Sequence, residues 1–420
     1  MDPSKFLILS ILTLLAHNCS CQSVPSHNEE GRRVVSVDDY FAKGDGATDD
    51  SKAFKRAWKE TCSSSVSAVL VVPKRRRYLL EQLNFTGPCK SPVTFLIKGT
   101  LDAPLNRSVW NDKNRRLWIV FDSVRNLVVK GGGTINGNGH IWWQNSCKRN
   151  KTLPCIGAPT ALTFVSCNYL RVKNLRIKDS QQFHVVVKDS REVKLSKLFI
   201  HAPEKSPNTD GIHLDHASNV VIRNCEIRTG DDCISIWTGS KNVRVHKIVC
   251  GPGHGISIGS LGKNNTKNHV MNVKVDGAIL NGTTNGVRIK TWQGGRGYAK
   301  HITFKNIAMH SVKNPILIDQ FYCDSKDPCH EQHDAVGIKQ VVYKNIVGTS
   351  ASKVSLKFNC SKSLPCRGIK LQDINLVGED GMRTHSSCSS VHLTKKGFVF
   401  PTPCVFGKNK TLVTRKSENW

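Results

Sequence analysis

A short phrase of alternating apolar and polar residues recurs along the middle of the chain, from about residue 126 to residue 377. Each copy has two or three apolar residues in alternation, then a polar or glycine corner, then another short apolar run. Alternation with β-branched residues predicts a strand, a corner and a second strand rather than a helix. The copies start at Leu170, Val193, Val220, Val243, Val273, Ile302, Val341 and Ile369.

The starts of these copies are separated by steps of 23, 27, 23, 30, 29, 39 and 28 residues. A repeat of this length, with one such unit per turn, indicates a solenoid whose coils bury apolar residues against one another. The alternative is a β-sandwich, which places strands about 8–12 residues apart and predicts no constant phrase at the longer period. The pattern therefore predicts an all-β fold, a right-handed parallel β-helix.

One segment ahead of the repeats, from Asp50 to Ser63, is expected to be a short helix. A solenoid needs a cap on its terminal coil, and the apolar side of this helix suits that purpose. Its solvent-facing side is expected to carry Lys52, Lys55, Arg56 and Lys59, and its apolar side Ala53, Phe54, Ala57 and Trp58.

The N-terminus has the pattern of a secretory signal. Lys5 precedes an apolar run from Phe6 to Ala16, which at 11 residues is short of the roughly 20 needed to span a bilayer. Small and polar residues follow through Ser23. We therefore expect a signal peptide at 1–23, a single β-helix catalytic domain at 24–400 and a solvated tail at 401–420. No other stretch approaches membrane length, so a secreted, soluble chain without a membrane span is expected.

The cysteines agree with secretion. The chain has 16, and losing Cys19 and Cys21 with the signal leaves an even number, 14. A zinc protein would need tight Cys-x-x-Cys pairs, which the mature chain lacks. We expect Cys167 and Cys225 to be buried free thiols and the others to form disulfides: Cys62 with Cys89, Cys147 with Cys155, Cys233 with Cys250, Cys323 with Cys329, Cys360 with Cys366, and Cys388 with Cys404.

The charge of the chain and its glycosylation sequons limit the classes of partner that it can have. The chain has 61 Lys and Arg against 32 Asp and Glu, a net charge of +29. Such a surface attracts a polyanion: a nucleic acid, an anionic lipid or an acidic polysaccharide. Seven glycosylation sequons in the mature chain favour a secreted glycoprotein; they begin at Asn84, Asn106, Asn150, Asn264, Asn281, Asn359 and Asn409.

The repeat also predicts a column of chemistry-bearing residues. Neighbouring coils of a β-helix stack ~4.8 Å apart, so residues one repeat apart should lie above one another. Asp210, the pair Asp231 and Asp232, and His254 follow at 21 and 23 residues. Two further steps of 34 residues lead to Arg288, with Lys290 beside it, and to Tyr322. Asp231 and Asp232 would face opposite ways on a strand, so both reach one cleft only if Gly230 places them at a bend.

Each of these residues taken singly is more often structural, since an Asp-Gly pair commonly forms a turn. Three carboxylates with a histidine and two cations in register are a rarer coincidence. Clustered carboxylates repel one another and a polyanion, so their presence needs a reason. Acid–base chemistry on a glycosidic bond supplies one, with one protonated acid and one ionised base that activates water.

Four motifs resemble those of the plant polygalacturonases, glycoside hydrolases of family 28, and the resemblance covers almost everything from Val37 onward, including residues 42–50. The motifs lie at 208–213, 230–233, 250–260 and 288–291. The resemblance implies hydrolysis of α-1,4-galacturonosyl linkages in de-esterified pectin, with inversion, in plant cell-wall modification. The resemblance also implies a reaction that needs no metal or other cofactor.

The resemblance also implies a role for each matched residue. Asp231 would be the general acid, Asp210 and Asp232 would hold and deprotonate the attacking water, and His254 would support the protonation state of the acid. Arg288 and Lys290 would bind galacturonate carboxylates, with Asn208 and Tyr322 in the same substrate-binding set. We expect a monomer in the extracellular cell wall, with pectin and not nucleic acid as partner.

Two features depart from a simple match. Direct stacking at ~4.8 Å is nearer the ~5–5.5 Å carboxylate gap of retaining enzymes than the ~6.5–9.5 Å of inverting ones, so the stereochemistry rests on the resemblance. Trp237 stands where the family usually has glycine after Ile236, and its ring either stacks on a sugar or narrows the cleft.

Three other classes of protein share some of these features. A pectate lyase also has a β-helix and an anionic substrate, but it would need calcium and would form an unsaturated product. A non-catalytic pectin-binding wall protein would release no reducing ends. A secreted nuclease would use the positive charge, but aromatic residues are sparse, the basic residues are dispersed and no metal site for phosphate transfer is visible.

Overall fold

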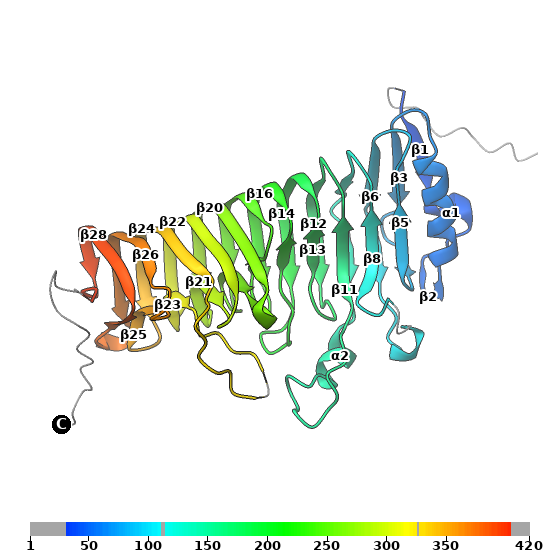
Figure 1. Ribbon diagram of the computed structural model, residues 1–420. Helices are drawn as coiled ribbons and strands as arrows, with labels where there is room; N and C mark the ends of the chain where they lie inside the picture. The colour runs from blue at the N-terminus through cyan, green and yellow to red at the C-terminus, as the bar shows by residue number, and fades with distance from the viewer. Residues whose placement is uncertain (1–30, 111–113, 326, 405–420) are drawn as a thin grey trace, which may run out of the picture.

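The computed structural model describes residues 31–110, 114–325 and 327–404. The signal peptide expected at 1–23 lies outside these residues. The described residues form the predicted parallel β-helix, a long stack of coils with α1 at one end and β28 at the other (Figure 1). All strand pairings along the stack are parallel, and such crossovers are right-handed in nearly all proteins.

Two parallel sheets run the length of the stack. Within the described residues, the larger sheet has 17 strands and the smaller has 11. The larger sheet contains β1 (Arg33–Ser36), β2 (Asp45–Asp49), β3 (Ala68–Val72), β4 (Arg77–Leu79), β6 (Val93–Ile97), β7 (Thr100–Asp102), β9 (Val128–Lys130), β10 (Thr134–Asn136), β12 (Arg171–Lys178), β14 (Arg191–His201), β16 (Ser218–Arg228), β18 (Lys241–Cys250), β20 (Lys267–Asn281), β22 (Arg296–Val312), β24 (Gly337–Ser350), β26 (Cys366–Gly378) and β28 (Val391–Phe400). The smaller sheet contains β5 (Leu83–Thr86), β8 (Leu117–Asp122), β11 (Thr160–Val165), β13 (Val185–Lys188), β15 (Ile212–Asp215), β17 (Ile234–Ile236), β19 (Ile256–Leu261), β21 (Asn285–Thr291), β23 (Asn314–Asp319), β25 (Val354–Asn359) and β27 (His385–Ser389).

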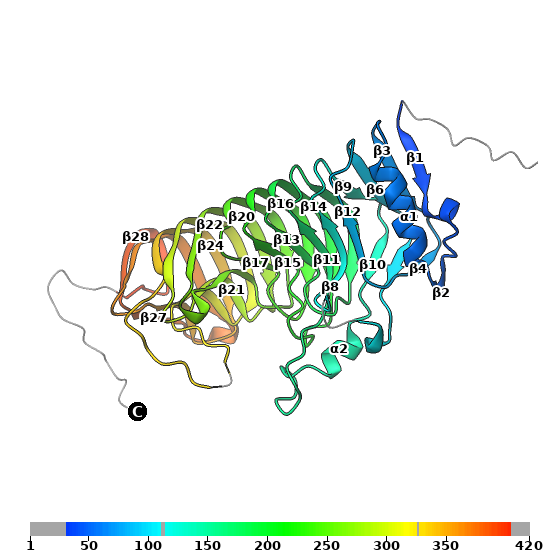
Figure 2. The same ribbon diagram turned by 45° about the vertical axis from the view of Figure 1, so that its right-hand side comes forward.

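Helices are short and lie outside the sheets. The α-helices are α1 (Ser51–Cys62) and α2 (His140–Gln144), and single 3-10 turns are η1 (Val37–Tyr40), η2 (Arg107–Val109), η3 (Lys263–Asn265) and η4 (Glu379–Gly381). The segment that carries α2 and the loop between β23 and β24 both project from the same long side of the stack (Figures 1 and 2).

The register confirms the repeat that the sequence predicts. Val193 pairs with Val220, and the column continues through the predicted phrase starts to Ile369. The apolar members of each phrase point inward and are fully buried, as at Val220 and Val243. Because a one-residue slip would turn every apolar side chain outward, the alternation fixes the register.

The polar corners of the phrase bend each long strand. Asn224, Asn306 and Asn345 stand at equivalent corners with φ of 52°, 55° and 50°. Asparagine adopts this left-handed conformation more easily than most residues because its short amide bonds locally. The corner therefore belongs to the repeat and recurs in each coil.

The predicted helix caps the stack, in agreement with its sequence pattern. Phe54, Ala57 and Trp58 of α1 are buried, whereas Lys52, Lys55, Arg56 and Lys59 are exposed. The Trp58 ring lies 5.1 Å from that of Phe85 and 5.6 Å from that of Phe121, so aromatic side chains close the first coils.

All six predicted disulfides are present, and Cys167 and Cys225 are buried free thiols. The disulfide from Cys388 to Cys404 ties the chain past residue 400 to the last coils, and Pro401 and Pro403 are buried. Residues 401–404 thus belong to the folded body, and the rest of the proposed tail, 405–420, lies outside the described residues.

Candidate active site

A cleft of about 680 Å³ lies on the side of the stack that is formed by the smaller sheet. Residues of the turns that lead into β15, β17 and β19 line it, together with Arg288 and Lys290 of β21. All eight residues predicted from the sequence line it: Asn208, Asp210, Asp231, Asp232, His254, Arg288, Lys290 and Tyr322.

The register shows how these residues come together, and it corrects the predicted column. Ile212, Ile234 and Ile256 pair in sequence, so Asp210, Asp232 and His254 stand at equivalent positions in three coils. Arg288 does not lie above His254, because it pairs with Ser257. The strict column is therefore wrong at this coil. Arg288 and Lys290 reach Asp232 because they are long side chains that cross back over the intervening coil.

Asp232 is the most buried carboxylate of the cleft, with 1% exposure. Arg288 Nη2 donates to Asp232 Oδ1 at 2.7 Å, and Lys290 Nζ donates to Oδ2 at 2.8 Å. Burial alone would raise the pKa of Asp232, but the charges of Lys290 and Arg288 outweigh burial and hold that pKa well below its usual range. Asp232 is therefore ionised.

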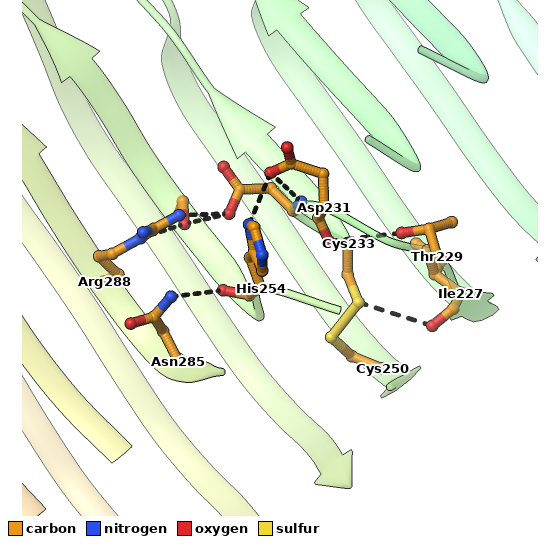
Figure 3. The surroundings of a disulfide bond; sticks show 10 residues. Ile227, Thr229, Asp231, Cys233, Cys250, His254, Asn285 and Arg288 are labelled. Carbon is orange, nitrogen blue, oxygen red and sulfur yellow. Dashed lines mark hydrogen bonds and ion pairs between the residues drawn. A yellow bond between two sulfur atoms is a disulfide. The ribbon is translucent and has the colours of Figure 1, made fainter. Parts of the chain in front are cut away.

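Asp231 points into the open part of the cleft beside His254 (Figure 3). His254 Nδ1 lies 2.9 Å from Asp231 Oδ1, and the Asp232 backbone N–H donates to the same oxygen at 2.8 Å. Burial lowers the pKa of His254, but the hydrogen bond and charge of Asp231 outweigh it, and the net shift is upward. The imidazole thus fixes the orientation of the Asp231 carboxyl.

Asp210 is buried at the equivalent position one coil earlier, with 6% exposure. Burial, and then the charges of Asp231 and Asp232, raise the pKa of Asp210 well above its usual range. The proton on Asp210 thus depends on its buried position and on the charges of both neighbouring aspartates. The cleft consequently holds a proton at a pH at which an isolated aspartate is ionised.

A bend allows both aspartates of the pair to face the cleft, as the sequence analysis requires. Residues 230 and 231 form that bend, directly before β17. A Cβ on Gly230 would lie 2.1 Å from the Ser206 carbonyl oxygen, so the backbone passes too close for a side chain. Cys233, two residues further, is bonded to Cys250 in the next coil (Figure 3).

Comparisons with known proteins agree with this geometry. Residues 62–398 match the model of glycosyl hydrolases family 28. The chain belongs to glycosyl hydrolases family 28. It is 57% identical over 357 residues to a protein from Persea americana named polygalacturonase, covering 85% of this chain and 77% of that one. It is 51% identical over 391 residues to polygalacturonase-2 of Solanum lycopersicum, covering 93% and 85%.

Solved structures of this family have the same fold. An exopolygalacturonase from Thermotoga maritima superposes with a TM-score of 0.71 at 20% identity, over 87% of this chain and 90% of that one. An endo-xylogalacturonan hydrolase from Aspergillus tubingensis gives 0.73 at 25% identity, over 87% and 99%. As a member of family 28, the chain is a glycoside hydrolase.

Trp237 departs from the usual family 28 pattern. It follows β17 directly and lines the cleft. Its indole N–H donates to the Ser260 carbonyl at 2.6 Å, so the ring is held in place. His213 lies 5.9 Å from Trp237 between ring centroids, and Phe183 stacks on His213 at 4.9 Å. Three flat side chains on successive coils thus form one wall of the cleft.

The opposite part of the cleft is bordered by Tyr322. Lys290 Nζ lies 5.2 Å from the centre of the Tyr322 ring, and Trp292 meets that ring edge to face at 5.5 Å. Burial raises the pKa of Tyr322 above its usual range, so its hydroxyl is neutral. The hydroxyl can therefore donate a hydrogen bond to substrate.

Two disulfide-closed loops border the cleft. Lys148 follows Cys147 on the α2 segment, and Asp324 follows Cys323 after β23. Lys148 Nζ and Asp324 Oδ1 form an ion pair at 2.5 Å. The two loops thus meet above the cleft, although 176 residues separate these two side chains in sequence.

Ser257, buried beneath the cleft, and two residues that line it, Lys148 and Asp324, were not predicted from the sequence. Ser257 donates to Asp232 at 2.7 Å and accepts from Arg288 Nε at 3.0 Å, so it joins the two charges. Four polar residues, each between two apolar ones, pair in one column: His213, Ser235, Ser257 and Arg288. That common apolar–polar–apolar triplet is the signal that could have identified Ser257. Lys148 and Asp324 carry no such signal because loops meet in ways that spacing does not encode.

The carboxylates could suggest a cation site, since ligand atoms of Asp231, Asp232 and His254 lie within 4.8 Å of one another. The donor set does not suit a divalent cation. Both oxygens of Asp232 already face a cationic side chain, and His254 is bonded to Asp231. A metal ion here would be repelled by two fixed positive charges.

Proposed function

We propose that this chain is a polygalacturonase, which hydrolyses the α-1,4-galacturonosyl linkages of de-esterified pectin in the plant cell wall. Its membership of family 28 and its relatives support this function, and the family property implies inversion at the anomeric centre. The observation that carries the proposal is Asp232, a buried carboxylate that two cations keep ionised beside two further carboxyl groups in one cleft.

In the proposed mechanism, Asp231 protonates the leaving oxygen. Its side chain is 16% exposed at the floor of the cleft, and it can therefore reach substrate. Burial and neighbouring charges raise the pKa of Asp210, so that a proton is kept in the cleft, and His254 orients the Asp231 carboxyl group. Asp210 and Asp232 hold the attacking water, and the ionised Asp232 accepts its proton.

Arg288 and Lys290 have two roles in this proposal. They keep Asp232 ionised, and they carry two positive charges against its single negative charge. The surplus positive charge favours a galacturonate carboxylate at the same end of the cleft. Asn208 and Tyr322, which line the cleft on either side of these groups, complete the proposed substrate-binding set.

Secretion to the wall and a monomeric state complete the proposal. The disulfides suit an oxidising compartment, and no helix among the described residues is long and apolar enough to cross a membrane. Of the sequon asparagines, those at 84, 106, 150, 264 and 281 are exposed, whereas Asn359 is partly buried and donates to Asp319 at 3.0 Å. The first five are therefore the better glycan acceptors. Size-exclusion chromatography tests the monomer.

The experiment is the release of reducing ends from de-esterified polygalacturonate by the purified secreted protein. We expect reducing ends to appear with no ultraviolet-absorbing unsaturated product, and the rate to persist in the presence of a calcium chelator. An unsaturated product that requires calcium would mean lyase chemistry. Binding to pectin without any release of reducing ends would mean a wall-binding protein. Either result would contradict the proposal.

A further inference from the structure

A second groove, of about 680 Å³, lies on the larger sheet and shares no lining residue with the cleft. It runs across the first halves of β14, β16, β18, β20 and β22, ahead of the corner that bends each strand. Because the cleft lies on the turns and strands of the smaller sheet, the catalytic residues make no use of this groove.

Exposed cations line this groove and continue beyond it toward β12. Lys194 pairs with Arg171 on one side, and Arg244 pairs with Lys274 on the other, so these side chains recur at one strand position. Lys173 and Arg223 occupy a second position, two residues further along their strands. Successive coils lie ~4.8 Å apart, so the cations form a stripe along the stack.

Most of these cations have no ion-pair partner among the residues that the structure describes. Five of them are exposed and form no ion pair with any carboxylate of the described residues: Arg171, Lys173, Lys194, Arg223 and Arg244. Asp276 on this face pairs with Lys274 and Lys305. Glu192 lines the groove and keeps its negative charge, since it accepts only from the neutral amide of Asn219, but the unpaired cations outnumber it. The stripe therefore presents uncompensated positive charge to the solvent.

The floor of the groove carries a ladder of side-chain amides. Asn272 donates to Asn242 at 3.0 Å, and Asn242 donates to Asn219 at 2.9 Å. Each of these asparagines has φ of 56°, so their amides project from successive strands in a regular row. Each amide nitrogen has a second hydrogen and each oxygen a second lone pair, which can bond to hydroxyl groups.

We infer that this groove binds a second stretch of acidic polysaccharide, outside the cleft and without cleaving it. A uronic-acid chain offers a carboxylate on every sugar for the cations and hydroxyl groups for the amides. An anionic membrane fits less well, because surface binding to lipid uses apolar side chains and none of the exposed large apolar residues lines the groove. The choice of galacturonan as the ligand rests on the proposed function.

The test compares two triple variants that each remove three positive charges. One is Lys194→Thr with Arg223→Thr and Arg244→Thr, since threonine suits a strand. The control is Lys52→Gln with Lys55→Gln and Arg56→Gln on the exposed side of α1. Binding to insoluble de-esterified polygalacturonate is measured at low salt with Asp231→Asn added to each protein, so that the polymer is not cleaved and the cleft contributes equally in all of them. Hydrolysis of a soluble trigalacturonide is measured separately, without Asp231→Asn.

We expect the groove variant to bind the insoluble polymer at least ~10-fold more weakly, as expected for several exposed charge contacts acting together. The control should change binding less than about twofold, and both variants should keep wild-type kcat/KM on the trigalacturonide. Equal weakening in both variants would overturn the inference, because binding would then follow net charge alone.

Two further probes separate the possible ligands. If phosphatidylserine vesicles or duplex DNA bind as tightly as polygalacturonate, and the groove variant loses them equally, the groove is a general anion surface and the inference fails. Absence of trigalacturonide hydrolysis in the wild type would refute the proposed function instead. The binding comparison still decides whether the groove holds the polymer.

Discussion

The three aspartates of the cleft have different surroundings, and these decide what each can do. Asp232 is buried against two cations, Asp210 is buried without one, and Asp231 is open to the cleft. Asp232 is thus held ionised, whereas burial and the charges of its neighbours raise the pKa of Asp210 so that it keeps a proton. This separation is the condition for general acid and general base to act at the same pH.

Exchange of each aspartate for asparagine should separate catalysis from stability. Asp231→Asn should lower kcat by at least ~10²-fold and leave the thermal midpoint close to wild type, because the side chain is a partly exposed acid. Asp232→Asn should also abolish turnover, but it leaves Arg288 and Lys290 without their counter-charge, which costs about 3–5 kcal/mol of unfolding free energy. Turnover assays and calorimetry on both variants measure the difference. Equal stability of the two variants would contradict the role of Asp232 as the buried counter-ion.

Lys290→Ala should change the pH profile as well as KM. The charge of Lys290 helps to hold the pKa of Asp232 down, and ionised Asp232 is present only above that pKa. Without Lys290 the pKa rises, so the acid limb of kcat/KM should move to higher pH. KM should also rise roughly 10- to 100-fold with loss of a charge-assisted bond to substrate. An unchanged acid limb with a raised KM would mean that Lys290 acts on substrate alone.

Among single residues, the sequence predicted which side chains lie together where spacing and chemistry coincide, and their catalytic roles stay a prediction. The eight predicted residues line one cleft because the repeat sets their coil and glycines set their bends. The contact of Arg288 with Asp232 was not predicted, since it depends on the length of a side chain that crosses a coil. Ser257 was missed because one serine between two apolar residues is ordinary in a strand.

Among the strands and turns, the alternation of apolar and polar residues sets the register of the strands. The turns before the strands of the smaller sheet place the carboxyl groups in the cleft. The smaller sheet brings short strands to the cleft, and the bend before β17 turns Asp231 and Asp232 to one side. The repeat length could be read from the sequence because each phrase start pairs with the next. The meeting of the loops at Lys148 and Asp324 could not be read, because it depends on loop paths.

Gly230→Ala tests the bend. The added Cβ would lie 2.1 Å from the Ser206 oxygen, so the turn before β17 must shift and take the aspartates with it. We expect a loss of kcat of at least ~10²-fold, since a displacement of about 1 Å is enough for such a loss. Gly337→Ala is the matched control, because its Cβ would meet no atom nearer than 3.5 Å. Wild-type kcat in Gly230→Ala would show that the bend does not depend on this close approach.

At the scale of the whole molecule, the stack places different chemistry on different sides. The α1 cap closes one end, and the α2 segment projects from one long side (Figure 2). Lys148, which follows α2, and Asp324 line the cleft. The net charge of +29 is not confined to the cleft, because exposed cations also follow the larger sheet. The composition predicted a polyanion partner, but only the register showed which cations lie together.

The proposed function requires the cleft to recognise galacturonate through its carboxylate. The measurement is the initial rate of reducing-end release from unmethylated and from fully methyl-esterified polygalacturonate, under identical conditions. Methylation removes the charge that pairs with Arg288 and Lys290, so we expect kcat/KM to fall by at least ~10-fold on the esterified polymer. Equal rates on the two polymers would contradict a cleft that recognises the carboxylate.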